Sequence, residues 1–146
     1  MTKTAFISGH RDVTIEEFEQ YYVQSIKKAI EDGDNFVIGD YQGVDYLAQK
    51  YLFYVGYENV IVYHMFKAPR NHVQSFVTRG GYISDEDRDS AMTKDSDYDI
   101  AWIRPGKKKS GTEQNINRRA NLLKVGTFGV MLDALKSFPN FPGDLA

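Results

Sequence analysis

The sequence of 146 residues contains no cysteine, which excludes a disulfide framework and a thiol nucleophile. It also lacks any apolar run near the roughly 20 residues that a transmembrane helix needs. The formal net charge is only −2, so bulk charge does not mark the chain as a polyanion binder. A strand-like run follows Met1 without a signal-peptide pattern, and a cysteine-free chain suits a reducing compartment, so we expect a cytoplasmic location.

What is present is typical of one globular domain. The chain has about the length of a single domain, and its apolar fraction is ordinary for a globular protein. A chain of this size can build a hydrophobic core without a metal or a disulfide. We therefore expect a single nucleotide-binding domain over residues 1–138, followed by a loose tail over residues 139–146.

Strand-like and helix-like segments alternate along the chain. Short apolar runs with β-branched residues are typical of buried strands, and apolar residues at helical spacing follow them. Thr14 and Glu17 form a T-x-x-E pattern, which indicates a helix start. The order predicts an α/β fold, a Rossmann-like three-layer domain with a mostly parallel central sheet of about five strands. We expect strands over residues 3–8, 35–39, 59–65 and 98–104, and helices over residues 14–33, 44–56, 84–94 and from 112 onward.

Two segments leave alternatives open. Residues 66–83 are polar and contain Pro69 and two glycines, which is typical of a long connection. The basic residues of this segment suit an anion-binding lid or an ordinary exposed loop. Residues 126–132 are compatible with a short fifth strand, and residues 131–137 are compatible with a helix.

Three strand-to-helix bends combine glycine with polar or basic residues. In a parallel sheet such bends meet at the carboxyl edge, where ligands bind at the point at which the strand order reverses. Glycine lets the backbone approach a phosphate, and each helix start offers unpaired N–H groups. We therefore predict a ligand-binding site formed by Gly9, His10, Arg11, Asp12, Gly39, Asp40, Tyr41, Gly43, Asp45, Pro105, Gly106, Lys107, Ser110, Gly111 and Thr112.

Each of these bends also has an ordinary structural interpretation. Turns favour glycine and aspartate, a run of lysines that begins at Lys107 can be a solvated surface, and Thr112 can cap its helix. His10 is a candidate general acid or base, or a loop histidine bonded to the backbone. Arg11 is the strongest candidate for a phosphate clamp, because its planar fork makes two parallel hydrogen bonds.

Several motifs with defined chemistry do not occur. The sequence has no H-E-x-x-H, no G-x-x-x-x-G-K-[ST] and no G-x-S-x-G pattern. The acidic stretch from Asp85 to Asp99 matches no calcium loop, and helix capping and surface charge account for it. We therefore expect neither a metal nor a cofactor.

Four segments, ISGHRD, VIGDYQGVDYLAQ, RDSAM and DIAWIRPGKKKSGTEQNI, follow one another in an order that resembles the SLOG superfamily. This group includes the "lonely guy" phosphoribohydrolases, DNA-processing protein A and small phage and bacterial nucleotide-ligand domains. Its members typically show a G-x-x-G-x-D-x-x-A segment and a P-G-G-x-G-T loop. Here the first corresponds to Gly39 through Ala48 and the second to Pro105 through Thr112. The resemblance implies a Rossmann-like domain that binds nucleotides or molecules derived from them.

The resemblance also suggests candidate catalytic residues. In the hydrolases of the family an arginine and the glutamate of G-T-x-x-E act on an N-glycosidic bond. The arginine matches Arg88, whereas the glutamate position falls on Asn115. Glu113 lies two residues earlier, on a different helix face. The candidate catalytic residues are Arg88, which matches the motif arginine, and Glu113, which is the glutamate close to the motif position.

Three functions are compatible with these observations. The favoured one is a module that senses or sequesters a nucleotide, an ADP-ribose-like molecule or a cyclic nucleotide. Tyr41 and Trp102 are candidates for stacking on the base, although the position of Trp102 within a predicted strand favours a place in the core. The second is an N-glycosidic hydrolase of nucleoside 5′-monophosphates, with Asp12 or Asp45 as further candidate carboxylates, so enzymatic activity stays open. The acidic balance argues against the third, a DNA-binding domain. The expected partners are a nucleotide-like small molecule and further copies of this chain, as a homodimer or a higher homo-oligomer, and we expect no membrane partner.

Overall fold

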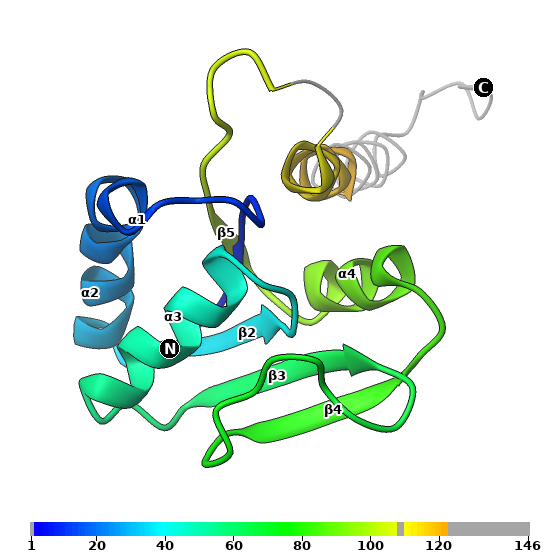
Figure 1. Ribbon diagram of the computed structural model, residues 1–146, viewed down its shortest axis with the longest axis horizontal. Helices are drawn as coiled ribbons and strands as arrows, with labels where there is room; N and C mark the ends of the chain where they lie inside the picture. The colour runs from blue at the N-terminus through cyan, green and yellow to red at the C-terminus, as the bar shows by residue number, and fades with distance from the viewer. Residues whose placement is uncertain (1, 108–109, 123–146) are drawn as a thin grey trace, which may run out of the picture.

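A five-stranded parallel sheet forms the centre of the fold (Figure 1). The computed structural model describes residues 2–107 and 110–122. The strand order is β4-β3-β2-β1-β5, and every neighbouring pair is parallel. This architecture confirms the predicted α/β fold. The strands are β1 (Thr4–Ser8), β2 (Asn35–Gly39), β3 (Val60–Met65), β4 (Val77–Tyr82) and β5 (Tyr98–Ala101).

Helices cover both faces of the sheet. One face carries α1 (Ile15–Tyr21), α2 (Val23–Glu31) and α3 (Val44–Tyr54). The other face carries α4 (Asp85–Lys94), and the helix of residues 111–122 lies beside it (Figure 1). None of the helices in the described ranges is long and apolar enough to cross a bilayer.

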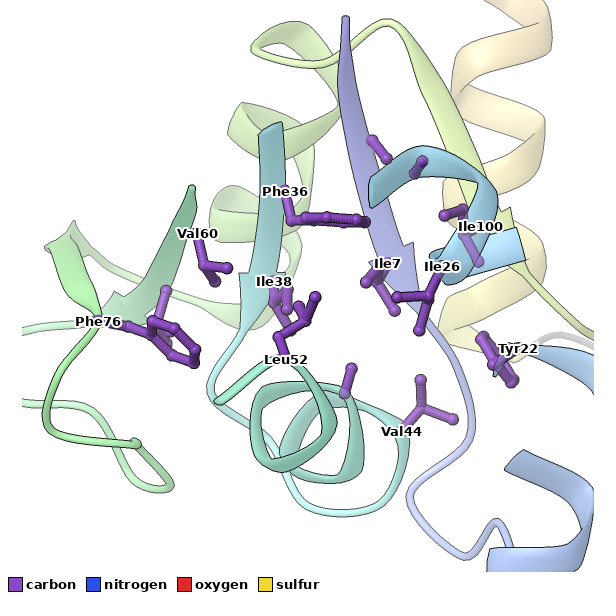
Figure 2. Packing of buried hydrophobic residues seen from close by; sticks show 14 of the residues in the cluster. Ile7, Tyr22, Ile26, Phe36, Ile38, Val44, Leu52, Val60, Phe76 and Ile100 are labelled. Atoms are coloured by element: carbon purple, nitrogen blue, oxygen red, sulfur yellow. The ribbon is translucent and has the colours of Figure 1, made fainter. Parts of the chain in front are cut away.

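The strands divide their apolar residues between the two layers, because successive side chains of a strand point to opposite faces. Ile7 and Ile38 belong to the larger cluster, which they form with residues of α1, α2 and α3 (Figure 2). Phe6 and Val37, the neighbouring residues, belong to a second cluster with Met92 of α4. The second cluster lies beneath the candidate site described below.

The segment over residues 66–83 is not wholly a loop, since it contains the edge strand β4. Among the described residues this strand pairs only with β3, and its residues are mostly exposed, so it lacks the apolar pattern of a buried strand. At Gly80 a Cβ atom would lie 2.2 Å from the ring of His64, so the edge strand needs glycine where this ring packs. Residues 126–137, with their two alternatives, and the predicted tail lie outside the described residues.

Two predicted elements differ from the structure by more than one or two residues. The helix expected over residues 14–33 is divided at Tyr22, whose backbone φ of −121° leaves the helical range. The fully buried Tyr22 hydroxyl donates to Ser8 O and accepts from the Trp102 backbone N–H. The fourth predicted strand ends at Ala101, because its partner strand β1 ends opposite it, at Ser8. The predicted capping box at Thr14 is confirmed.

The strand order reverses at β1, which has β2 on one side and β5 on the other. Such a reversal leaves a crevice beyond the carboxyl ends of the two strands, because their following connections lead to opposite faces of the sheet. The segments after β1 and β5 are two of the three glycine-containing bends singled out from the sequence. The topology therefore places them at the same edge of the sheet.

Candidate functional site

A pocket of about 260 Å³ opens at the carboxyl ends of β1 and β5. Its apolar lining comes from Phe6 and Met92, on the face of the sheet that α4 covers. The loops that follow β1, β2 and β5 contribute polar groups, and α4 closes another side. The volume lies near the lower end of the range for small-molecule sites, so the pocket suits a compact ligand.

Gly43 brings the loop after β2 into direct contact with the loop after β1. Its φ is +75°, and a Cβ atom there would lie 2.4 Å from the carbonyl oxygen of His10 and 2.5 Å from that of Arg11. The Val44 N–H donates to His10 O over 3.3 Å. No side chain can be accommodated between these loops, so glycine is required here for both its backbone conformation and its size.

The third bend ends in a helix N-terminus that faces the pocket. Ser110 caps this helix, because the Glu113 N–H donates to Ser110 Oγ over 3.1 Å. The helix therefore begins one residue earlier than predicted, and Thr112 is not its cap. Gly111 and Thr112 line the pocket, and N–H groups of a first helical turn have no intrahelical acceptor. This side of the pocket thus offers positively polarised donors, with Lys107 nearby.

Arg88 also lines the pocket, but carboxylates surround its guanidinium. Nη1 donates to Asp40 Oδ1 over 2.6 Å and lies 3.1 Å from Asp85 Oδ1. Nε and Nη2 donate to Asp89 Oδ1 over 3.1 and 2.9 Å. The side chain is 5 % exposed, so little of it is free to meet a ligand. The catalytic role of Arg88 stays a prediction, and the geometry assigns it first to organising these acids.

Asp40 belongs to this buried network and does not line the pocket. Arg70 donates to Asp40 from its backbone N–H and from its guanidinium, and Arg70 also contacts Asp85. Burial alone would raise the pKa of Asp40, but the hydrogen bonds from Arg70 and the charge of Arg88 lower it overall. Arg70 therefore anchors the β3–β4 connection to the sheet edge by internal contacts.

Asp45, in the first turn of α3, is the buried acid that this network leaves unpaired. Its Oδ2 accepts from the Tyr41 N–H over 3.1 Å, and Oδ1 has no hydrogen-bond partner in the described part of the chain. Burial raises the pKa of Asp45 to about 7, although the charge of Arg88 opposes the increase. Gly39 makes room for the approach, since a Cβ there would lie 2.5 Å from Asp45 Oδ2 and 3.0 Å from Arg88 Cζ.

Ser8, the last residue of β1, supplies a second unsatisfied group. Its side chain lines the same pocket, and the residue is only 5 % exposed. Within residues 2–107 and 110–122, Ser8 Oγ is a buried hydroxyl without a hydrogen-bond partner. Buried polar groups are almost always bonded, so an unpartnered hydroxyl at a pocket wall indicates a position where a ligand or a water completes the bond.

His10 links the first and third bends. Its Nε2 accepts the Arg104 backbone N–H over 2.9 Å, which places the proton of the neutral ring on Nδ1. Burial lowers the pKa of His10, so the neutral form is favoured. Arg104 also pairs with Asp12 and Glu17, and its hydrogen bond lowers the pKa of Glu17 to about 2. These contacts fix the β5 loop against the β1 loop.

The structure brings most of the predicted residues together. Those that line the pocket are Gly9, His10, Arg11, Tyr41, Asp45, Arg88, Lys107, Ser110, Gly111 and Thr112. Those that do not are Asp12, Gly39, Asp40, Gly43, Pro105, Gly106 and Glu113, and four of these support the site from behind as described above. The sequence interpretation did not include Phe6, Ser8, Asp85, Asp89, Met92 and Asn115 in the binding site.

The missed residues carried weak signals. Phe6 and Ser8 are two positions apart on β1, so the alternation of side chains in a strand places both on the same face. Asn115, at the glutamate position of the family motif, donates to Asp89 Oδ2 over 3.2 Å and is buried. Trp102 is not a lining residue, and its ring stacks on Tyr21 at a centroid distance of 4.1 Å.

Comparisons with models of protein families, with curated protein sequences and with solved structures yield no match. The fold alone thus defines the class, a Rossmann-like parallel α/β domain. In the described part of the chain, no group of three or more His, Cys, Asp or Glu side chains is arranged to hold a metal ion.

Proposed function

We propose that this chain is a small-molecule-binding domain of the SLOG type. In this proposal the pocket at the β1–β5 edge holds a phosphate-bearing, nucleotide-like ligand, and the domain senses or sequesters that ligand. The single observation that carries the proposal is that hydrogen-bond donors from the bends after β1 and β5 line one pocket. The cation Arg88 of this pocket is already paired with Asp40 and Asp89.

The distribution of charge supports an anion at the end formed by the β1 and β5 loops. The three carboxylates around Arg88 take up most of its hydrogen-bonding capacity. The groups left available are the first-turn amides of Gly111 and Thr112 and the exposed side chain of Arg11. Lys107 also lines the pocket, and its Nζ lies 3.9 Å from Asp12 Oδ1. Amides at a helix start and mobile cationic side chains are the usual means of binding phosphate.

The order of motifs along the chain supports the family assignment. The residues that resemble the SLOG pattern, Gly43, Asp45, Gly111 and Thr112, lie in or directly behind one pocket. Gly43 is required by contact between backbones, and Asp45 lines the pocket wall. This placement, with Gly43 behind the pocket and the other three residues in its wall, is what a family motif used for ligand binding would show.

Calorimetric titration tests the proposal. The panel comprises AMP, ADP, cyclic AMP, ADP-ribose and inorganic phosphate, added to the wild-type protein and to the variants Arg11→Ala and Thr112→Ala. Arg11→Ala should weaken binding by roughly ten- to hundredfold, the range for one hydrogen bond to a charged group. Thr112→Ala removes the hydroxyl but keeps the backbone amide, so it should weaken binding by a smaller factor. Lys28→Ala, which changes an exposed side chain of α2, is the control and should bind like the wild type. Unchanged affinity in both pocket variants would refute the proposed site.

One observation favours a second candidate, an N-glycosidic hydrolase of nucleoside 5′-monophosphates. Asp45 is a buried acid whose pKa of about 7 suits proton transfer, and it lines the pocket. In such a reaction the bond from C1′ to the base breaks, water supplies hydroxyl to C1′, and the departing base takes the proton. Chromatography of AMP incubations would show free adenine, which Asp45→Asn abolishes and Glu113→Ala does not. Absence of adenine with the wild type favours the binding module.

A further inference from the structure

We propose that Asp45 is the specificity-determining group of the pocket, and that it meets the anionic ligand as a neutral carboxylic acid that donates a hydrogen bond from Oδ1. This inference rests on the proposed function and deepens it. It implies that ligand binding takes up a proton. It also implies a preference for ligands whose buried end presents a hydrogen-bond acceptor, such as a phosphate or carbonyl oxygen or a ring nitrogen.

The geometry distinguishes the two oxygens of Asp45. Oδ2 accepts the Tyr41 N–H over 3.1 Å, so this oxygen is the natural acceptor in either protonation state. Oδ1 has no partner within the described ranges, and Asp45 lines the pocket. A proton carried by Asp45 therefore belongs on Oδ1, where it is available to a ligand.

The surroundings of Asp45 disfavour its charged form. From α4, Arg88 attracts the carboxylate and Asp89 repels it, and Asp40 repels it from the loop after β2. Tyr22, at the α1–α2 junction, is a neutral phenol whose pKa is raised by burial. Arg88 carries the opposite charge to an ionised Asp45, yet its short contacts are with Asp40, Asp85 and Asp89. The neutral state of Asp45 is thus accessible near neutral pH.

A bound anion shifts this balance further. A phosphate in the same pocket adds negative charge close to a carboxyl group, and like charges favour protonation. The neighbouring Ser8 hydroxyl can donate a hydrogen bond to the same anion, because its oxygen has no partner in the described residues. His10 does not compete for the proton, since its Nε2 already accepts the Arg104 N–H. Asp45 is therefore the pocket group whose protonation follows ligand binding.

Titrations with AMP test the inference. Calorimetry between pH 6 and 8, in buffers of different ionisation enthalpy, gives both the affinity and the number of protons taken up. If only the acid form binds, wild-type affinity should fall about tenfold from pH 6 to pH 8, as the competent fraction decreases. Asp45→Asn, whose amide donates at every pH, should bind equally well at pH 6 and about tenfold more tightly than the wild type at pH 8.

The comparison of variants removes the contribution of the ligand's own phosphate. Wild type should take up about half a proton more than Asp45→Asn at pH 7, because the free acid is then half ionised. Glu58→Gln removes one exposed carboxylate two residues before β3, at the edge of the sheet opposite the pocket, and should behave like the wild type. Carboxyl-carbon NMR of Asp45 in the wild-type protein should show titration near pH 7 that moves upward when AMP is added.

Three outcomes overturn the inference. Equal pH slopes for wild type and Asp45→Asn, weaker binding of Asp45→Asn at every pH, or an Asp45 carbon signal that AMP does not shift would each do so. Failure of the proposed function looks different. In that case neither AMP, ribose 5-phosphate nor inorganic phosphate produces binding heat with the wild type or with Asp45→Asn.

Discussion

Arg88 Nη1 donates to Asp40 Oδ1 over 2.6 Å, and both side chains are almost completely enclosed. This contact joins α4 to the loop after β2, two elements that are 48 positions apart in the chain. A buried ion pair of this kind contributes little to stability by itself, but the loss of one partner leaves an uncompensated charge. The pair therefore fixes the position of α4 against the candidate pocket.

Replacement of Arg88 by Met should destabilise the domain by about 3 kcal/mol, because partly buried Asp89 would lose its cation and buried Asp40 would keep only Arg70. Urea denaturation monitored by circular dichroism measures this change. Lys28→Ala is the control, since it breaks an exposed pair with Asp32 and should cost at most about 0.5 kcal/mol. A cost below about 1 kcal/mol for Arg88→Met would show that the network is not integral to the fold.

Gly43→Ala should be more damaging than Gly56→Ala, although both glycines have φ near +75°. A Cβ atom at Gly43 would meet the backbone of the β1 loop at 2.4 Å, whereas nothing lies within 4 Å at Gly56. Backbone strain alone should cost Gly56→Ala about 1 to 2 kcal/mol. Thermal melting should show a larger loss for Gly43→Ala, together with weaker AMP binding. Equal losses would mean that the two loops separate readily.

Asp45→Asn should stabilise the unliganded domain at high pH. The pKa of Asp45 is raised in the folded state, to about 7, so its contribution to stability is present in acid and is lost as the pH rises to 7. The variant should match the wild type near pH 4 and exceed it above pH 7, by on the order of a few kcal/mol. Chemical denaturation at several pH values measures the difference. A constant difference across this range would contradict the raised pKa.

Ser8→Ala should separate stability from binding. Since Ser8 Oγ has no hydrogen-bond partner in the described residues, its removal should leave the free energy of unfolding within about 0.5 kcal/mol of the wild-type value. AMP affinity should nevertheless fall by roughly tenfold, as one donor to the anion is lost. Denaturation and calorimetry on the same preparation give both numbers. A large stability loss without a change in affinity would assign Ser8 to the core.

The regular part of the fold follows closely from the sequence. The apolar runs that contain Ile7 and Ile38 predict buried parallel strands, and Thr14 caps α1 as expected. The helix expected over residues 84–94 is α4, with Ser84 as its capping residue. The edge strand β4 was missed because its residues are mostly exposed and polar, with two glycines. An edge strand is held by backbone hydrogen bonds to one neighbouring strand, and these bonds do not require an apolar side-chain pattern that the sequence would show.

The candidate site is only partly visible in the sequence. Glycine-rich bends indicate where a ligand can approach, and Arg11 and Thr112, predicted on this basis, line the pocket. The sequence cannot show that Arg88 gives its hydrogen bonds to Asp40 and Asp89, because those contacts depend on how α4 packs on the sheet. Nor can it show that Ser8 has no partner, since satisfaction of a hydroxyl depends on every neighbour in three dimensions.

The most direct test of the central claim is an NMR titration of the ¹⁵N-labelled protein with AMP. The account predicts that the amide resonances of Gly111 and Thr112 shift most, together with those of Gly9 and Arg11, and that inorganic phosphate moves a subset of the same signals. Shifts confined to the opposite edge of the sheet, around Lys28 and Tyr98, or no shift at millimolar ligand, would contradict it.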